Sequence, residues 1–150
     1  MGALKERLQA DMKAAMKSGA KERLGTIRLA LAAIRQREID ERVELDDEAA
    51  TAVLDRMVKQ RRESISQYRQ GGREDLVAVE EAEIVVLREY LPQPLDESVL
   101  EASILAAIEE TGASTVADMG KVMAVLKPKL VGRADMSAVS SRVRVLLSAR

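Results

Sequence analysis

Residue types that usually carry catalysis and ligand recognition are missing from this 150-residue chain. It has no cysteine, histidine, tryptophan or phenylalanine, and its only aromatic residues are Tyr68 and Tyr90. Without Cys and His, the usual nucleophile–base pairs cannot be built, and zinc, copper and haem lose their preferred ligands. We therefore expect no catalytic residue, no metal and no cofactor. Without an aromatic platform for stacking bases, any contact with nucleic acid should use shape and phosphates.

The sequence also lacks long apolar runs. No segment approaches the roughly 20 residues needed to span a membrane. Charges recur from Lys5 onward, which is unlike the apolar segment of a signal peptide. Charged residues make up 33% of the chain and nearly balance, with a formal net charge of −1. Together with the missing cysteines, these features predict a cytoplasmic protein that has no membrane partner.

Helical periodicity runs through nearly the whole chain, and only three prolines interrupt it. Apolar residues spaced three and four apart mark seven helices, and no strand pattern competes with them. Pro92 and Pro94 cannot both lie inside a helix, so residues 92–95 are the predicted linker. We therefore predict an all-α fold. It has a four-helix N-terminal part, residues 1–91, and a small three-helix C-terminal domain, residues 96–150.

Local signals place several helix ends. Gly19, the pair Gly71-Gly72 and Gly112 suit the left-handed conformation that ends a helix, and Thr115 is a predicted N-cap for the sixth helix. The fourth helix has two neighbouring apolar rows. One row contains Leu76, Val79, Val86 and Tyr90, and the other contains Ile84, Leu87 and Leu91.

Charged residues interrupt the apolar stripes of the third and fourth helices. If these helices fold back antiparallel about Gly71-Gly72, Arg61 approaches Glu83, and Arg62 approaches Glu81 on the outer flank. Such a pair is either an ordinary surface pair, worth roughly 0–1 kcal/mol, or a partly buried pair that fixes the register of the hairpin. We predict a structural, partly buried pair for Arg61–Glu83 and a surface pair for Arg62–Glu81.

Basic residues gather towards the C-terminus. Residues 112–150 contain seven Lys or Arg against two Asp, so their net charge is +5 and that of the remainder is −6. The segment 118–135 reads DMGKVMAVLKPKLVGRAD. Here we expect a helix cut short by Pro128, followed by a loop that contains Gly132. The segment is either a well-solvated loop or a site for a partner of negative charge.

Gly120 stands near the start of the sixth predicted helix, where glycine costs up to about 1 kcal/mol relative to alanine. Packing against a neighbouring helix is the commoner reason for such a glycine. The other is a phosphate that reaches the helix-start N–H groups beside Lys121. The seventh helix carries a row of small hydroxyl groups with one arginine, which suits a sugar–phosphate backbone or a plain solvated face. The row contains Ser137, Ser140, Ser141, Arg144 and Ser148.

Three strings of this sequence resemble one known family. They read KQRRESISQYRQGGREDL, E..E...L.EYLPQPL and ASTVADMGKVMAVLKPKLVGRADMSAVSSRV. Together they are similar to the signatures of the YqeY family, which itself resembles the C-terminal tail of the B subunit of the glutamyl/aspartyl-tRNA amidotransferase (GatB). The resemblance covers nearly the whole chain, although residues 1–45 match less distinctively. It implies an all-α fold with a larger N-terminal bundle and a small three-helix C-terminal domain.

The resemblance also implies a function. In the amidotransferase the tail engages the body of the tRNA, while glutamine hydrolysis and amide transfer occur elsewhere. The family's glycine–lysine pair falls on Gly120 and Lys121, its proline–lysine-to-glycine loop on Pro128, Lys129 and Gly132, and its next basic position on Arg133. One departure is Ala124, where relatives often have glycine.

We therefore predict a non-catalytic helical module that binds tRNA or another structured RNA. The predicted nucleic-acid contacts are Gly120, Lys121, Lys127, Lys129, Gly132, Arg133 and Arg144. One alternative is an interaction adaptor for translation-associated proteins. A second is an accessory of a carbon–nitrogen ligase that uses glutamine as the amide donor, for which the chain has no obvious nucleophile.

Overall fold

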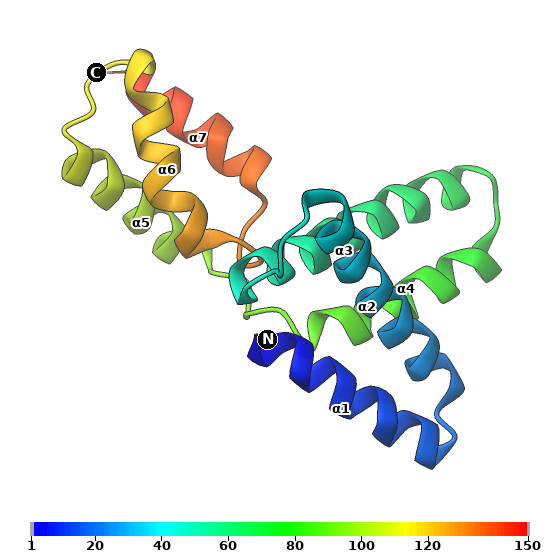
Figure 1. Cartoon of the computed structure of the whole chain (residues 1–150). Helices are drawn as coiled ribbons and strands as arrows, with labels where there is room; N and C mark the ends of the chain where they lie inside the picture. The colour runs from blue at the N-terminus through cyan, green and yellow to red at the C-terminus, as the bar shows by residue number, and fades with distance from the viewer. Residues whose placement is uncertain (1, 150) are drawn as a thin grey trace. The chain divides into compact units, whose positions relative to one another are not determined.

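The protein is built from helices alone. The computed structural model describes residues 2–149, and within that range it contains seven α-helices, one 3₁₀ turn and no β-strand (Figure 1). The elements are α1 (Ala3–Ser18), α2 (Lys21–Glu41), α3 (Asp47–Gln70), α4 (Glu74–Arg88), α5 (Glu97–Thr111), η1 (Val116–Asp118), α6 (Met119–Leu130) and α7 (Met136–Ser148). The predicted all-α class is confirmed.

The chain divides into two compact units, Met1–Pro92 and Gln93–Arg150. The first unit contains α1 to α4, and the second contains α5, η1, α6 and α7. Each unit has a hydrophobic core of its own. The predicted linker, residues 92–95, lies at the boundary between them, and α5 begins directly after Asp96, whose carboxylate accepts a hydrogen bond from the Val99 N–H at 3.1 Å.

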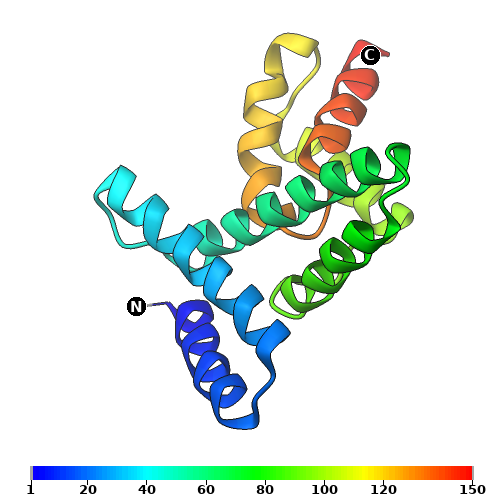
Figure 2. The ribbon, with the colours of Figure 1, turned by 90° about the vertical axis from the view of Figure 1, so that its right-hand side faces the viewer.

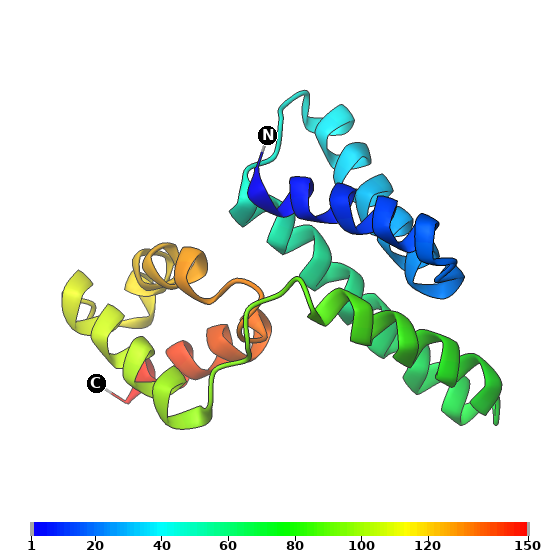
Figure 3. The same ribbon diagram turned by 90° about the horizontal axis from the view of Figure 1, so that it is seen from below.

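In the N-terminal unit, α1 and α2 form one hairpin, and α3 and α4 form another (Figure 3). The turn between α1 and α2 uses Gly19, whose φ of 74° is a left-handed conformation that glycine adopts without steric cost. Side chains of all four helices meet in the core, where Leu8, Ile27, Leu54 and Leu87 are almost fully buried. The apolar side chains in this core supply most of the unit's stability, because helices gain more from burying an apolar face than from intrinsic propensity.

Helix α4 ends in a polar network that joins it to α1 and α2. Tyr90 is 5% exposed, and its hydroxyl donates a hydrogen bond to the Asp11 carboxylate. Arg23 donates to the same hydroxyl at 3.3 Å and pairs with Glu89. The Arg7 guanidinium lies 4.6 Å from the centre of the Tyr90 ring. Burial of the phenol, together with its bond to Asp11, raises the pKa of Tyr90 well above its ordinary value.

The two apolar rows of α4 are not buried equally. Val77, Leu87 and Tyr90 are buried, whereas Val79 is 55% exposed. The predicted core position at Val79 is therefore wrong. The second row is buried at Leu87 and Leu91, whereas the first row is buried only at its end, at Tyr90, because α4 packs against α2 and α3 on the other side of Val79.

A buried ion pair joins the start of α1 to the end of α2. Lys5 is 8% exposed, and its ammonium lies 2.7 Å from a carboxylate oxygen of Glu38. The same oxygen accepts the Leu45 N–H at 2.8 Å. These two donors, the Lys5 ammonium first, hold the pKa of Glu38 below its usual value. Glu38 therefore fixes the loop after α2 through its hydrogen bond to Leu45, a role that the apolar spacing did not predict.

The C-terminal unit packs its three helices around Ile104, Ile108, Leu126 and Val143, all of which are fully buried. Figure 2 shows α6 and α7 side by side and running in opposite directions. Within residues 2–149, no helix is both long and apolar enough to cross a lipid bilayer.

The sixth helical segment begins after Thr115, the predicted N-cap, but its first turn is not α-helical. A 3₁₀ turn at Val116–Asp118 precedes the helix, and the Asp118 carboxylate accepts the backbone N–H of Ser114 at 3.0 Å and of Thr115 at 3.3 Å. The end of α6 differs from the prediction, because the helix continues through Pro128 to Leu130. Proline removes one backbone donor, but in the last turn the helix keeps its remaining bonds, including that from the Val131 N–H to the Lys127 carbonyl at 3.0 Å.

Candidate nucleic-acid interface

The start of α6 presents an open backbone next to a cation. Gly120 is exposed, and a Cβ built on it would meet no atom within 4 Å beyond its own stretch of helix. The explanation that a neighbouring helix packs on this glycine is therefore wrong. Lys121 has a side chain that is 72% exposed, and its ammonium lies 3.9 Å from the Asp118 carboxylate. So weak an exposed pair leaves the ammonium available to a ligand.

The Asp118 carboxylate has a structural task at the same place. The N–H groups of Ser114 and Thr115 donate to it and hold its pKa below the usual range, with Lys121 contributing less. A carboxylate held by two backbone donors keeps the turn before α6 in one conformation. It also puts one negative charge beside Lys121, so a phosphate at this helix start would meet a nearly neutral pair there.

The two lysines at the end of α6 lie on nearly opposite flanks. Residues two apart along an α-helix differ in direction by about 200°, so Lys127 and Lys129 point apart. The Lys129 ammonium lies 4.0 Å from Glu110 on α5. Lys127 lies seven residues after Gly120, which puts the two on almost the same side of α6. No ion pair holds the exposed Lys127 within the described residues.

The two arginines of α7, Arg142 and Arg144, also point to nearly opposite sides of their helix. Arg142 points towards α5 and donates to Glu101 at 2.8 Å. Arg144, two residues later, is exposed on the other flank of α7 and makes no side-chain ion pair within the part of the chain described. The flank of α6 and α7 that faces away from α5 therefore carries Gly120, Lys127 and Arg144. We name these three residues the α6–α7 flank, whereas Lys121, one residue after Gly120, points about 100° away around the helix.

The remaining predicted contacts lie in the loop between α6 and α7. Gly132 is buried and has a φ of 76°, a left-handed conformation that lets the chain turn after α6. Arg133 is half-buried. Its Nε donates to the Gln93 carbonyl at 3.3 Å, and its own carbonyl accepts the Leu95 N–H at 3.0 Å. Both residues thus have structural roles that hold the loop against residues 93–95.

The predicted α3–α4 pairs are only partly as expected. The Arg61 Nε lies 2.6 Å from a carboxylate oxygen of Glu83, with side chains that are 14% and 22% exposed. Glu81, however, pairs with Arg69 at 2.7 Å, so the predicted Arg62–Glu81 pair is wrong. Arg62 and Arg69 are seven residues apart on the same face of α3, and both line the hollow beside Glu81, whose carboxylate pairs with Arg69.

We expect the double substitution Arg61→Met/Glu83→Leu to leave the free energy of unfolding unchanged or to raise it by about 1–4 kcal/mol, because well-packed apolar residues can replace a buried pair. The single substitution Glu83→Leu should be destabilising, because it leaves the Arg61 charge without its partner. Urea denaturation followed by circular dichroism measures both. If the double variant keeps the fold and the stability, the pair has no role in fixing the hairpin register.

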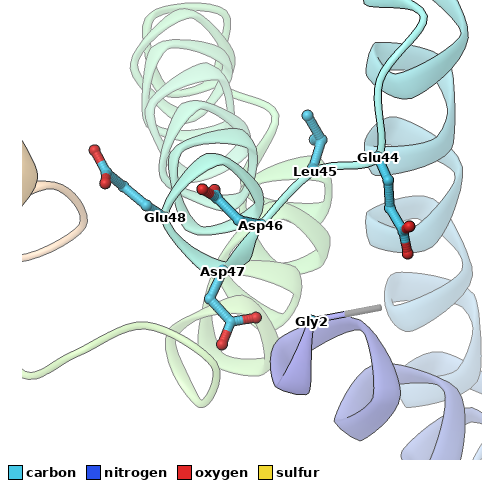
Figure 4. Close-up of a pocket in the computed structure, with 6 residues that line it drawn as sticks. All are labelled: Gly2, Glu44, Leu45, Asp46, Asp47 and Glu48. Atoms are coloured by element: carbon cyan, nitrogen blue, oxygen red, sulfur yellow. The ribbon is translucent and has the colours of Figure 1, made fainter.

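The carboxylates around the α2–α3 loop do not converge on a point. A hollow of about 600 Å³ is lined by Gly2, Leu45 and four acidic residues of the α2–α3 loop and the start of α3. Figure 4 shows that the carboxylates of Glu44, Asp47 and Glu48 point in different directions. Asp46 caps α3, and Asp47 accepts the Leu4 N–H at 3.1 Å. Across residues 2–149, no three ligating side chains gather so as to hold a metal ion.

Sequence reasoning missed the acidic partners that α5 supplies. Glu110 lies beside Lys129 and Glu101 beside Arg142, so these acidic residues lower the net positive charge on the side of α6 and α7 that faces α5. The signal was present, because the fifth helix is acidic while the last two helices are basic. A helical projection alone could not assign these pairs, since it does not show which flanks of the three helices meet.

Comparison with known proteins identifies the family. A family model described as Yqey-like protein matches residues 5–147. The chain belongs to this family. It is 33% identical over 151 residues to the altered inheritance of mitochondria protein 41 of Pyrenophora tritici-repentis, covering 96% of this chain and 81% of that protein. It is 39% identical to the protein of that name from Eremothecium gossypii, covering 56% of this chain and 46% of the relative.

A third relative carries the same name. The Clavispora lusitaniae protein is 36% identical over 103 residues, covering 67% of this chain and 60% of its own length. All three names call the protein mitochondrial. The prediction of a cytoplasmic protein is therefore wrong, since these names point to mitochondria. The lack of cysteine, on which that prediction depended, is not a positive signal for the cytoplasm.

Proposed function

We propose that this Yqey-like protein is a non-catalytic helical module whose C-terminal unit binds structured RNA, with tRNA as the first candidate. The observation that carries the proposal is the α6–α7 flank. On it, the exposed Lys127 and Arg144 lie on the same side as the open backbone of Gly120. Cations without an intramolecular partner lose little on binding, because no ion pair has to be broken first.

The chemistry of the flank suits phosphates better than bases. Lysine and arginine can each neutralise a phosphate and release condensed counterions, which is the main source of sequence-independent affinity. The N-terminus of α6 adds backbone N–H groups near Gly120, where a side chain would limit close approach. Ala124 lies between Gly120 and Lys127, and its side chain is too small to block close approach to this side of α6. No aromatic side chain lies in the unit, so base stacking has no part.

The other predicted contacts have different places in the proposal. Lys129 points to the other side of α6, where its ammonium lies 4.0 Å from Glu110, so the proposal assigns it no phosphate. Arg133 and Gly132 act by shaping the loop that ends α6, since both are committed to backbone geometry or to the Gln93 carbonyl. Their substitution should change binding through the shape of the unit.

The test is a pair of matched double variants. We expect Lys127→Gln/Arg144→Gln to weaken binding to bulk tRNA about tenfold, and to make the slope of log affinity against log salt shallower by about 0.7–0.9 for each phosphate that is no longer neutralised. Gel-shift or fluorescence-anisotropy titrations at several salt concentrations measure both quantities. The control Lys129→Gln/Arg142→Gln removes the same charge from the α5 side.

The two variants separate the flank from general charge. A larger reduction of affinity in the first variant supports the α6–α7 flank, whereas equal reductions would mean that the RNA responds to net charge alone. If wild-type protein does not bind tRNA at low salt, the proposal fails. Release of ammonia from glutamine by the purified chain would contradict its non-catalytic part.

A further inference from the structure

Helix α2 carries apolar residues on two different sides. One side is in the core, where Ile27, Ala30 and Ile34 are 1% exposed or less. The other side faces solvent, with Leu29 at 49% and Ile39 at 60% exposed. A helix that covers one core needs a single apolar stripe, so the second stripe has no use within this unit.

The exposed stripe has the spacing of a coiled-coil seam. It contains Gly25, Leu29, Ala32, Gln36 and Ile39, all exposed, at intervals of four, three, four and three residues. This is the alternation of a and d positions in a heptad. Five positions span about 21 Å of helix at 1.5 Å per residue. We name these five residues the α2 seam.

Arginines border the α2 seam. Arg28 and Arg35 each precede an a position, which makes them g residues of the heptad, and Arg42 is the C-cap of α2. All three are exposed, and none forms a salt bridge in the described part of the chain. Glu38, whose charge interacts with that of Arg35, is already paired with the buried Lys5. On the opposite flank, Asp40 accepts a hydrogen bond from Gln36 at 2.9 Å.

Two further features suit a helix as the occupant. Gly25 and Ala32 let a second backbone come close, and Leu29 and Ile39 offer larger side chains to pack into it. A hollow of about 260 Å³ between α2 and α3, lined in part by Gln36 and Met57, continues the seam and could receive a side chain. A single polar residue inside an apolar seam, here Gln36, is the device that fixes register in paired helices.

We propose that the α2 seam docks an amphipathic helix of a partner protein, with acidic residues along the flank that faces Arg28 and Arg35. Charge complementarity selects this occupant. A second copy would bring two arginine rows together if it packed antiparallel, and if it packed parallel it would set Ala33, not an acidic residue, opposite Arg28. A membrane surface would take Gln36 into apolar surroundings, and RNA would leave Leu29 and Ile39 without a partner.

A designed peptide tests the seam in the full-length protein. The probe is a helix of about 20 residues with leucine and isoleucine at a and d positions and glutamate at e and g. Glutamate repulsion keeps this peptide from pairing with itself. We expect saturable binding by isothermal titration calorimetry or anisotropy. Arg28→Glu/Arg35→Glu should weaken it about tenfold or more and should instead bind the matched peptide with lysine at e and g.

A matched pair of surface variants examines the apolar part. Ile39→Ser should weaken peptide binding about tenfold, whereas Val145→Ser, at a similarly exposed valine of α7, should leave it unchanged. Circular dichroism and the melting temperature check that both variants keep the fold. The proposal is overturned if the glutamate peptide does not bind or if Arg28→Glu/Arg35→Glu binds it as wild type does. It is equally overturned if Ile39→Ser acts only by abolishing self-association in sedimentation velocity or binding to anionic phosphatidylglycerol vesicles.

Discussion

We expect Tyr90→Ala to lower the free energy of unfolding of the N-terminal unit by about 3–5 kcal/mol, the usual cost of removing a large aromatic side chain from a core. Tyr90 is 5% exposed and packs among the residues of that core. Its removal also takes the donor from Asp11 and the ring from beneath Arg7. Because Tyr90 joins α4 to both α1 and α2, no small adjustment of one helix can fill the space.

Tyr90→Phe separates the two parts of this effect. It keeps the packed ring and removes only the hydroxyl, so we expect a destabilisation of about 1 kcal/mol. Urea denaturation followed by circular dichroism gives both values, and hydrogen exchange shows whether protection falls within residues 3–92. If Tyr90→Phe costs as much as Tyr90→Ala, the hydrogen-bond network with Asp11 and Arg23 matters more than the buried ring.

Most of the helical architecture could be predicted from local signals. Apolar spacing predicted the helices, and Gly19, Gly72 and Gly112 have the left-handed φ values expected where helices end. The all-α class required no long-range information, because a chain with no strand pattern and helical periodicity throughout has few other ways to bury its apolar residues.

The errors arose where two local solutions were compatible with the same pattern. Val79 and Leu87 lie on the two apolar rows predicted for α4, and only packing against other helices buries Leu87 and exposes Val79. Pro128 is a helix breaker in the interior but is tolerated in a last turn. Arg69 and Arg62 lie on one face of α3, and spacing alone does not show which of these identical side chains meets Glu81.

The candidate interface was limited by the same cause. The sequence shows how many cations the last two helices carry, but their directions depend on the helical phase and on which flank meets α5. Lys127 and Lys129 are neighbours in the sequence, yet the structure puts them on nearly opposite flanks, one beside Glu110 and one without an ion pair in the described residues. The α2 seam could not be predicted either. The sequence shows that α2 is rich in apolar residues, but only the structure shows which of them are buried and which are exposed.

We expect Leu126→Ala to unfold most of the C-terminal unit, because truncation of a fully buried leucine costs about 2–5 kcal/mol and a core of this size rarely supplies more than about 3–5 kcal/mol. Leu126 is 0% exposed and lies among Ile104, Ile108 and Val143 at the centre of its core. The side chain immediately precedes Lys127, so losing the fold of α6 also disperses the α6–α7 flank.

Hydrogen exchange on the full-length protein measures this effect unit by unit. Protection should fall through residues 97–148 and stay at the wild-type level in α1 to α4, which have their own core. Leu105→Ala is the matched control, since Leu105 lies on α5 with 43% of its surface exposed and its truncation should cost little. Binding of tRNA should fall in Leu126→Ala and persist in Leu105→Ala. If a variant with an unfolded C-terminal unit still binds tRNA, the RNA contact must be made by the N-terminal helices instead.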